Sequence, residues 1–109
     1  MTGLGSLIYG TVTDQMVKGR VLFDFSEILR PLKRGAKVSR SRWNGKGMFI
    51  YYVPEGAYNP CTKAAEELVN REGKVEYKAY IAMNTVDGSV VPWVASQTDL
   101  LAEDWYIVE

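Results

Sequence analysis

The alternation of apolar and polar residues along this chain predicts a protein rich in β-strands. Its most apolar run, residues 48–53, is typical of a central strand. Residues 75–86 alternate between two faces, and the Asp87-Gly88 pair that follows favours a hairpin into a further strand over residues 89–94. Shorter strands are predicted over residues 36–40, with Val38 facing inward, and over residues 105–108.

Two segments have the signals of helices. Residues 24–27 (Asp-Phe-Ser-Glu) have the spacing of a capping box, and four apolar residues at this point fall on one helical face: Phe25, Ile28, Leu29 and Leu32. Pro31 conflicts with a regular helix, so we expect a distortion over residues 27–31. Asn59-Pro60 is typical of a helix start and Gly73 of its end. The order of elements predicts an α+β fold, a mainly antiparallel sheet with an early helix and a second helix inserted between central strands.

The first 22 residues are predicted to be an N-terminal extension, and residues 23–109 a single domain. Residues 4–13 have the pattern of a short strand, residues 13–15 that of a turn, and Gly19-Arg20 marks a second break. This extension is either a hairpin or an arm laid on a neighbouring subunit, and the sequence leaves both open.

The composition excludes several classes of activity. Thirteen basic and 13 acidic side chains cancel, so no net field favours nucleic acid or an anionic membrane. The chain has no histidine and one cysteine, Cys61, which excludes an internal disulfide, imidazole catalysis and the common zinc sites. We expect no cofactor and no metal. No run reaches transmembrane length and no signal peptide is visible, so we expect a cytoplasmic protein.

Residues 91–105 carry a dense group of hydrogen-bonding side chains between Trp93 and Trp105. Ser96 has the position of an N-cap and Asp99 the position that closes a capping box, which predicts one helical turn from residue 97 to about residue 102. The N–H groups at the start of such a turn suit an anionic or strongly polar ligand. The structural alternative is a strand–turn–strand corner in which the tryptophans only fill the core.

Residues 40–46 place cationic, aromatic and amide side chains close together. Trp43 offers a face for a purine base, and Arg42 or Lys46 could neutralise a phosphate. Asn44-Gly45 favours a tight turn with positive φ. The structural alternative is a basic turn whose tryptophan covers one end of the sheet.

An acidic cluster follows at Asp99, Glu103 and Asp104. One of these carboxylates could accept hydrogen bonds from ribose hydroxyls, and their spacing matches no metal-binding loop. In the structural alternative, Asp99 caps the helical turn while Glu103 and Asp104 are solvated.

Read together, three stretches resemble the second Thoeris anti-defence family of small phage and prophage proteins. They are residues 42–48 (Arg-Trp-Asn-Gly-Lys-Gly-Met), residues 80–85 (Tyr-Ile-Ala-Met-Asn-Thr) with Asp87-Gly88, and residues 91–105. The resemblance covers about residues 23–108. It implies a homo-oligomer, commonly a tetramer, that binds the TIR-generated messenger glycocyclic ADP-ribose in the bacterial host cytoplasm and holds it intact. It also implies that some members bind cyclic dinucleotides at a separate site.

The resemblance implies a ligand site with two walls. On one wall Trp43 and Asn44 would contact base and ribose, with Lys46 near phosphate. The other wall would consist of Trp93, Ser96, Gln97, Thr98 and Asp99, with Tyr80 and Asn84 beside it. A sequestering protein needs no proton shuttle, which agrees with the composition. Two alternatives stay open: a carboxylate-dependent hydrolase of a nucleotide messenger that uses Asp99 and Asp104, and a protein-interaction module that blocks a defence protein.

Overall fold

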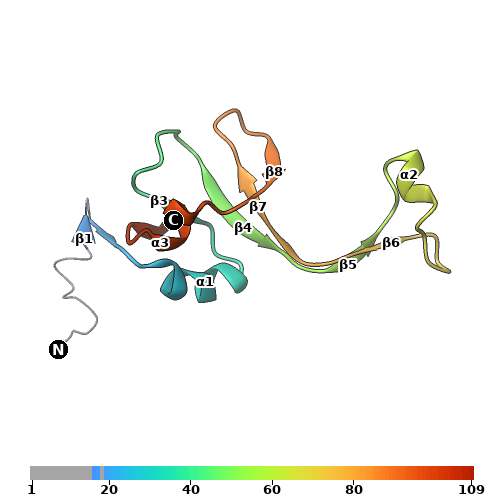
Figure 1. The fold of residues 1–109 in the computed structure, drawn as a ribbon, viewed down its shortest axis with the longest axis horizontal. Coiled ribbons are helices and arrows are strands. Elements are labelled where there is room, and N and C mark those ends of the chain that lie inside the picture. Colours follow the sequence, from blue (N-terminus) through green and yellow to red (C-terminus); the bar gives the residue numbers. More distant parts are fainter. Residues whose placement is uncertain (1–15, 18) are drawn as a thin grey trace.

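A computed structural model describes residues 16–17 and 19–109 and confirms the α+β fold (Figure 1). Residues 4–13 and 13–15, where the sequence predicts a strand and a turn, lie outside the described residues. In chain order the described elements are β1 (Met16–Val17), β2 (Arg20–Val21), α1 (Phe25–Lys33), β3 (Val38–Arg40), β4 (Phe49–Val53), β5 (Gly56–Tyr58), α2 (Lys63–Glu66), β6 (Val75–Tyr77), β7 (Tyr80–Asn84), β8 (Val90–Pro92), α3 (Gln97–Leu101) and β9 (Trp105–Ile107).

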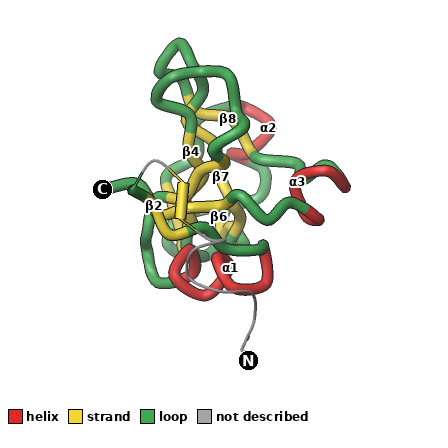
Figure 2. The backbone as a smooth tube through the Cα atoms, turned by 90° about the vertical axis from the view of Figure 1, so that its left-hand side faces the viewer, coloured by secondary structure: helices red, strands yellow, loops and turns green. Residues whose placement is uncertain are grey.

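The body of the protein is a five-stranded antiparallel sheet in the order β8-β7-β4-β3-β9. The apolar run 48–53 supplies β4, which lies in the middle of the sheet, as predicted. Helix α1 packs against the sheet (Figures 1 and 2). The centre of this core consists of five fully buried side chains: Ile28, Leu32, Val38, Ile50 and Trp105.

Helix α1 begins with the predicted capping box. Asp24 Oδ1 accepts a hydrogen bond from Glu27 N at 2.9 Å, and Asp24 N donates to Glu27 Oε1 at 2.9 Å. The helix continues through Pro31 as one element, and its last bonds run from Arg34 N to Pro31 O and from Gly35 N to Leu32 O. Pro31 cannot donate the helical hydrogen bond to Glu27 O, and the burial of Ile28 and Leu32 against the sheet offsets this loss.

The prediction of one long strand over residues 75–86 is wrong, because the chain breaks at residues 78–79 into β6 and β7. Pro54 follows directly after the end of β4 at Val53. After it the chain forms β5, which pairs with β6 as a separate two-stranded ladder. Proline cannot donate a ladder hydrogen bond, which is a physical reason for the interruption. The result is a ribbon that projects from the body, and the molecule measures 55 × 28 × 25 Å (Figure 1).

The helix predicted to start at Asn59-Pro60 and to end at Gly73 is much shorter in the structure. Helix α2 has four residues and begins after Thr62, whose Oγ1 accepts from Ala65 N at 3.0 Å. The Asn59 side chain instead accepts from Lys74 Nζ at 3.0 Å. Leu68, which would lie on the apolar side of a longer helix, is 69% exposed. A longer helix would have no core to cover at the tip of the ribbon, and short helices depend on such packing.

The described part of the N-terminal section joins the edge of the sheet. Strands β1 and β2 form a small ladder, with Gly19 at positive φ between them. Phe23 and Trp105 then exchange backbone hydrogen bonds of 2.8 and 3.1 Å. Among the residues described, no helix is both long and apolar enough to cross a membrane.

Candidate functional site

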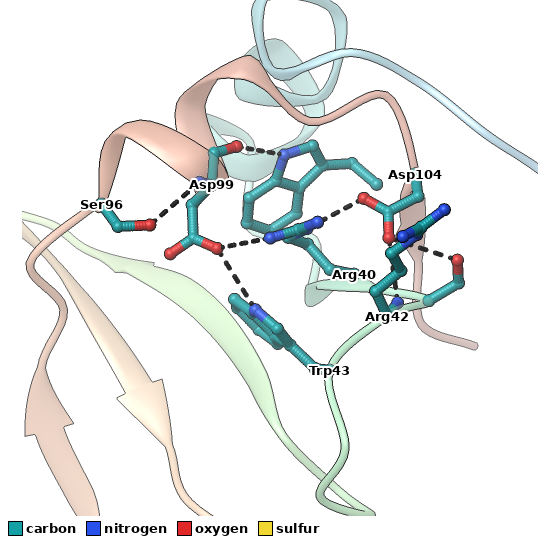
Figure 3. A network of polar contacts seen from close by, with 8 residues as sticks. Arg40, Arg42, Trp43, Ser96, Asp99 and Asp104 are labelled. Atoms are coloured by element: carbon teal, nitrogen blue, oxygen red, sulfur yellow. Dashed lines mark hydrogen bonds and ion pairs between the residues drawn. The ribbon is translucent and has the colours of Figure 1, made fainter.

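Arg40, at the end of β3, connects two of the predicted motifs. Its Nη1 lies 2.8 Å from Asp99 Oδ1, and its Nε lies 2.8 Å from Asp104 Oδ1 (Figure 3). The Arg40 side chain is 10% exposed and both aspartate side chains are 14% exposed. Arg40 therefore fixes β3 to α3 and to the residue before β9. We call this arrangement, together with Trp43 and Trp105, the polar corner.

The second oxygen of Asp104 holds the start of the loop after β3. Asp104 Oδ2 accepts from Arg42 N at 2.9 Å and from Ser41 Oγ at 3.4 Å, and Ser41 N donates to Asp104 O at 3.0 Å (Figure 3). Asp104 is thus not a solvated surface carboxylate, and that part of the structural alternative is wrong. Glu103 is exposed, as that alternative expected.

Asp99 also binds two indoles. Trp43 Nε1 donates to Asp99 Oδ1 at 3.3 Å, and Trp105 Nε1 donates to Asp99 O at 2.9 Å. Trp105 is fully buried between Trp43 and Trp93, whose ring centroids lie 5.3 and 6.0 Å from its own in edge-to-face geometry. Trp43 and Trp93 are each half-buried. The tryptophans fill core, as the structural alternative holds, but two of them also reach the surface.

The charges of the polar corner stabilise one another. Burial alone would raise the pKa of Asp99, but hydrogen bonds from Arg40, Ser96 and Trp43 outweigh it and hold that pKa below its usual value. Burial likewise opposes ionisation of Asp104, and Arg40 with the Arg42 backbone lowers its pKa. Burial would lower the pKa of Arg40, but the two aspartates raise it. All three groups are therefore charged at neutral pH.

Helix α3 confirms the predicted turn after Ser96. Ser96 Oγ accepts from Asp99 N at 3.0 Å, and the helix spans five residues (Figure 3). The Asp99 carboxylate, however, points toward Arg40 and Trp43. A ribose-accepting role for Asp99 would compete with these two contacts.

The loop over residues 43–48 is held against the β7–β8 hairpin. Asn84 Nδ2 donates to Gly47 O at 2.9 Å. A Cβ atom at Gly45 would overlap Cγ2 of Val86, so the close approach of the hairpin requires glycine there. The positive φ expected at Asn44-Gly45 lies instead at Gly47, where φ is +78°. Gly45 thus allows close packing and Gly47 supplies the positive φ, and the Asn-Gly pattern alone does not predict this division.

The predicted site residues do not form one cluster. Trp43, Ser96 and Asp99 meet in the polar corner. Six others lie at or near the surface around it, in three places. Asn44 and Lys46 are exposed in the loop that Asn84 holds; Gln97 and Thr98 are exposed on α3; Tyr80 and Trp93 line a groove next to α1.

Two open depressions flank the polar corner. One, of about 440 Å³, is lined by Arg40, Arg42, Thr98, Leu101, Ala102, Glu103 and Asp104. The other, which we call the α1 groove, is about 400 Å³ and is lined by Leu29, Lys33, Tyr52, Ala79, Tyr80, Ile81 and Trp93. Cys61 is exposed and its thiol is free. Within residues 16–17 and 19–109, no group of three or more His, Cys, Asp or Glu side chains could hold a metal ion.

The predicted site omitted Arg40, although the sequence contained a signal for it. Side chains two apart in a strand share a face, so Arg40 lies on the same face of β3 as the fully buried Val38. A cation on an inward face requires a carboxylate partner. Asp99 and Asp104 are those partners, but choosing them needs the fold, because they lie 59 and 64 residues away.

Comparison with known proteins agrees with the resemblance noted in the sequence. The family model described as the Thoeris anti-defense 2-like domain matches residues 23–108. A protein named Thoeris anti-defense 2, from Bacillus phage SP01, is 40% identical over 85 residues, which is 77% of this chain and 92% of that protein. The matched range contains the polar corner, the 43–48 loop and the α1 groove. The chain therefore belongs to the Thoeris anti-defense 2-like family.

Proposed function

We propose that this protein counteracts Thoeris immunity by binding the TIR-generated messenger glycocyclic ADP-ribose and holding it intact. Its family and its likeness to a phage protein of that name support an anti-defence role. The observation that carries the binding mechanism is the polar corner. There Arg40 joins the Trp43 loop to Asp99 and Asp104, in a fixed arrangement with half-buried indoles at the surface.

Binding without cleavage is supported by the charge state of the corner. A carboxyl group that acts as general acid at neutral pH needs a raised pKa, and a general base needs free access to water. The pKa values of Asp99 and Asp104 are lowered instead, and Arg40 occupies an oxygen of each. These two residues are the ones that a hydrolase would use here, so the corner favours a binding protein over the hydrolase alternative.

The loop beside the corner offers contacts for a nucleotide. A base stacked on an aromatic side chain contributes about 1–3 kcal/mol, and Trp43 is half-buried with exposed Asn44 and Lys46 following it. Asp104 holds one end of this loop and Asn84 the other. A loop that is already ordered loses less entropy when a ligand binds, which increases the affinity.

The size of the depressions supports an oligomer. Each depression next to the polar corner measures about 400–440 Å³. Both are open on a single chain, near the lower end of the ~300–1,000 Å³ range of ligand pockets. Enclosing a ligand of a few dozen non-hydrogen atoms takes more wall than one subunit presents. We therefore propose a homo-oligomer, a tetramer by family resemblance, with pockets completed between subunits in the cytoplasm of the bacterial host.

The proposal is tested by recovering the ligand. The protein is incubated with an equal amount of glycocyclic ADP-ribose, washed, denatured, and the released compound is identified by mass spectrometry. Intact messenger at close to one equivalent per site is the expected result. Cleaved product formed in excess over protein would establish the hydrolase, and no retained ligand would leave the protein-interaction alternative.

Two variants connect binding to the 43–48 loop. Trp43→Ala and Lys46→Gln are each expected to weaken messenger binding about fivefold or more, since a stacked base or a phosphate contact is worth about 1–3 kcal/mol. Lys63→Gln, on α2 in the ribbon, is the matched control and should bind normally. Trp43 also packs against Trp105, so its substitution could destabilise the fold. The melting temperature of Trp43→Ala is therefore compared with that of wild type before binding is measured. Lys46 is exposed, so Lys46→Gln tests the site without a loss of core packing.

A further inference from the structure

The α1 groove combines aromatic and cationic side chains. Its apolar floor includes Leu29 and Ile81, and Trp93 forms part of its wall. Tyr80 is 45% exposed, so part of its ring is available to a ligand. Lys33 reaches the groove from the last turn of α1. A flat ring could therefore contact Tyr80 or Trp93 while an attached anion lies near the ammonium group.

The charge around this groove is of one sign. A neighbouring depression of about 290 Å³ shares Leu29 and Lys33 with it and adds Ser26, Arg30 and Arg34. Together the two are lined by three cations and no carboxylate. Two further depressions contain acids: Glu55, Glu72 and Glu76 in the ribbon, and Glu103 and Asp104 next to Arg40. An anionic ligand is therefore better matched to the α1 groove than to either of these.

Arg30, Lys33 and Arg34 form no ion pair within the described part of the chain, where both ion pairs belong to Arg40. Basic residues in the last turn of a helix complement its dipole, which accounts for the position of Arg30 and Lys33. Stabilising the helix does not require an aromatic groove next to these cations. The presence of cations and aromatic side chains at the same groove is what points to a ligand.

We infer that the α1 groove binds the phosphate-bearing part of a heteroaromatic nucleotide, with Lys33 contacting the phosphate and Tyr80 and Trp93 facing the ring. The choice of a nucleotide rests on the proposed function. The inference adds Lys33, Leu29 and Tyr52 to the binding residues, none of which belongs to the 43–48 loop or to α3. It also gives Tyr80 and Trp93 a place separate from Trp43.

The test uses charge-removing variants at exposed positions, which should not affect folding. Wild type, Lys33→Gln, Lys46→Gln and the control Lys63→Gln are titrated with glycocyclic ADP-ribose by calorimetry, and with AMP and adenosine while Trp fluorescence is recorded. Lys33→Gln should weaken binding of the messenger and of AMP at least tenfold, because a hydrogen bond to a charged group is lost. Its binding of adenosine should change less than twofold, and Lys63→Gln should match wild type throughout.

The outcomes separate this inference from the proposed function. If wild type binds the messenger and Lys33→Gln binds it as tightly, the α1 groove is overturned and the proposed function stands. If wild type does not bind the messenger, the proposed function fails, and the groove is then judged on AMP alone. Tenfold weaker AMP binding by Lys33→Gln would retain the groove. An AMP affinity equal to that of adenosine, or no binding of either, would overturn it.

Discussion

The polar corner and the distal ribbon use aromatic side chains in opposite ways. In the corner, Trp105 is fully buried, its N–H donates to Asp99 O at 2.9 Å, and two further indoles pack against it edge to face. In the ribbon, Tyr58 and Tyr77 also pack edge to face, with ring centroids 5.8 Å apart, but both remain more than 40% exposed. The same kind of aromatic contact is core in one region and surface in the other.

The difference follows from the sequence separation of the contacts. Arg40 reaches Asp99 and Asp104 across 59 and 64 residues, so the polar corner exists only when β3, α3 and β9 are assembled. The ribbon is a hairpin whose strands pair with each other, and it projects from the body (Figure 1). A region held by few buried contacts can open without global unfolding. We therefore expect the corner to share the stability of the whole domain and the ribbon to tolerate substitution.

The largest effect is expected from Trp105→Ala. Removing a fully buried aromatic side chain costs about 3–5 kcal/mol of unfolding free energy, whereas an exposed apolar residue contributes within about 0.5 kcal/mol. Leu68→Ala in the ribbon is the comparison, since Leu68 is 69% exposed. Urea denaturation followed by circular dichroism measures both. Similar losses for the two variants would show that the ribbon is part of the cooperative core.

Arg40→Met should have the next largest effect. It leaves Asp99 and Asp104 charged and 14% exposed without their cation, which we expect to cost about 3 kcal/mol. Arg42→Met is the matched control, because Arg42 is exposed and Asp104 binds its backbone N–H rather than its side chain. The same urea experiment compares the two, and an equal loss would mean that the ion pairs contribute nothing beyond side-chain packing.

The pH dependence of stability should depend on the polar corner. Because the folded-state pKa values of Asp99 and Asp104 are lowered, their contribution is complete above the unfolded pKa of about 3.9 and is lost as the pH falls through the folded values. Without Arg40, burial would instead favour their protonated forms. The difference in unfolding free energy between wild type and Arg40→Met should therefore begin to shrink above about pH 3.9, as the pH falls through the raised pKa values of the variant, and continue to shrink as it falls through the lowered wild-type values. A constant difference across that range would contradict the ion-pair assignment.

The smallest effect concerns Asp87, a carboxylate held only by its own turn. Hydrogen bonds from Ser89 and Thr85 lower the pKa of Asp87 to about 2, although the side chain is exposed. Carbon-detected NMR titration should place its midpoint there in wild type and also in Arg40→Met, because the turn is local. The Asp99 midpoint should move upward in the variant. A parallel shift of Asp87 would show that the two networks are coupled.

The sequence by itself determined the features whose causes are local. The capping box at residues 24–27, the N-cap at Ser96, the Asp87-Gly88 hairpin and the central strand near Ile50 are confirmed. Each depends on hydrogen bonds or side-chain alternation within a few residues, so the chain carries the full signal. The same motifs were enough to identify the family, which the comparisons confirm.

Only the tertiary structure decided which side chains meet. Asn59-Pro60 has a good helix start, but the tip of the ribbon gives a long helix nothing to pack on, so α2 is four residues long. The predicted ligand residues are divided among the polar corner, the 43–48 loop, the surface of α3 and the α1 groove, and Arg40 and Lys33 join them from other elements. Burial and ion pairing depend on what lies across from a residue in space, and that partner is more than fifty positions away in the chain for Arg40.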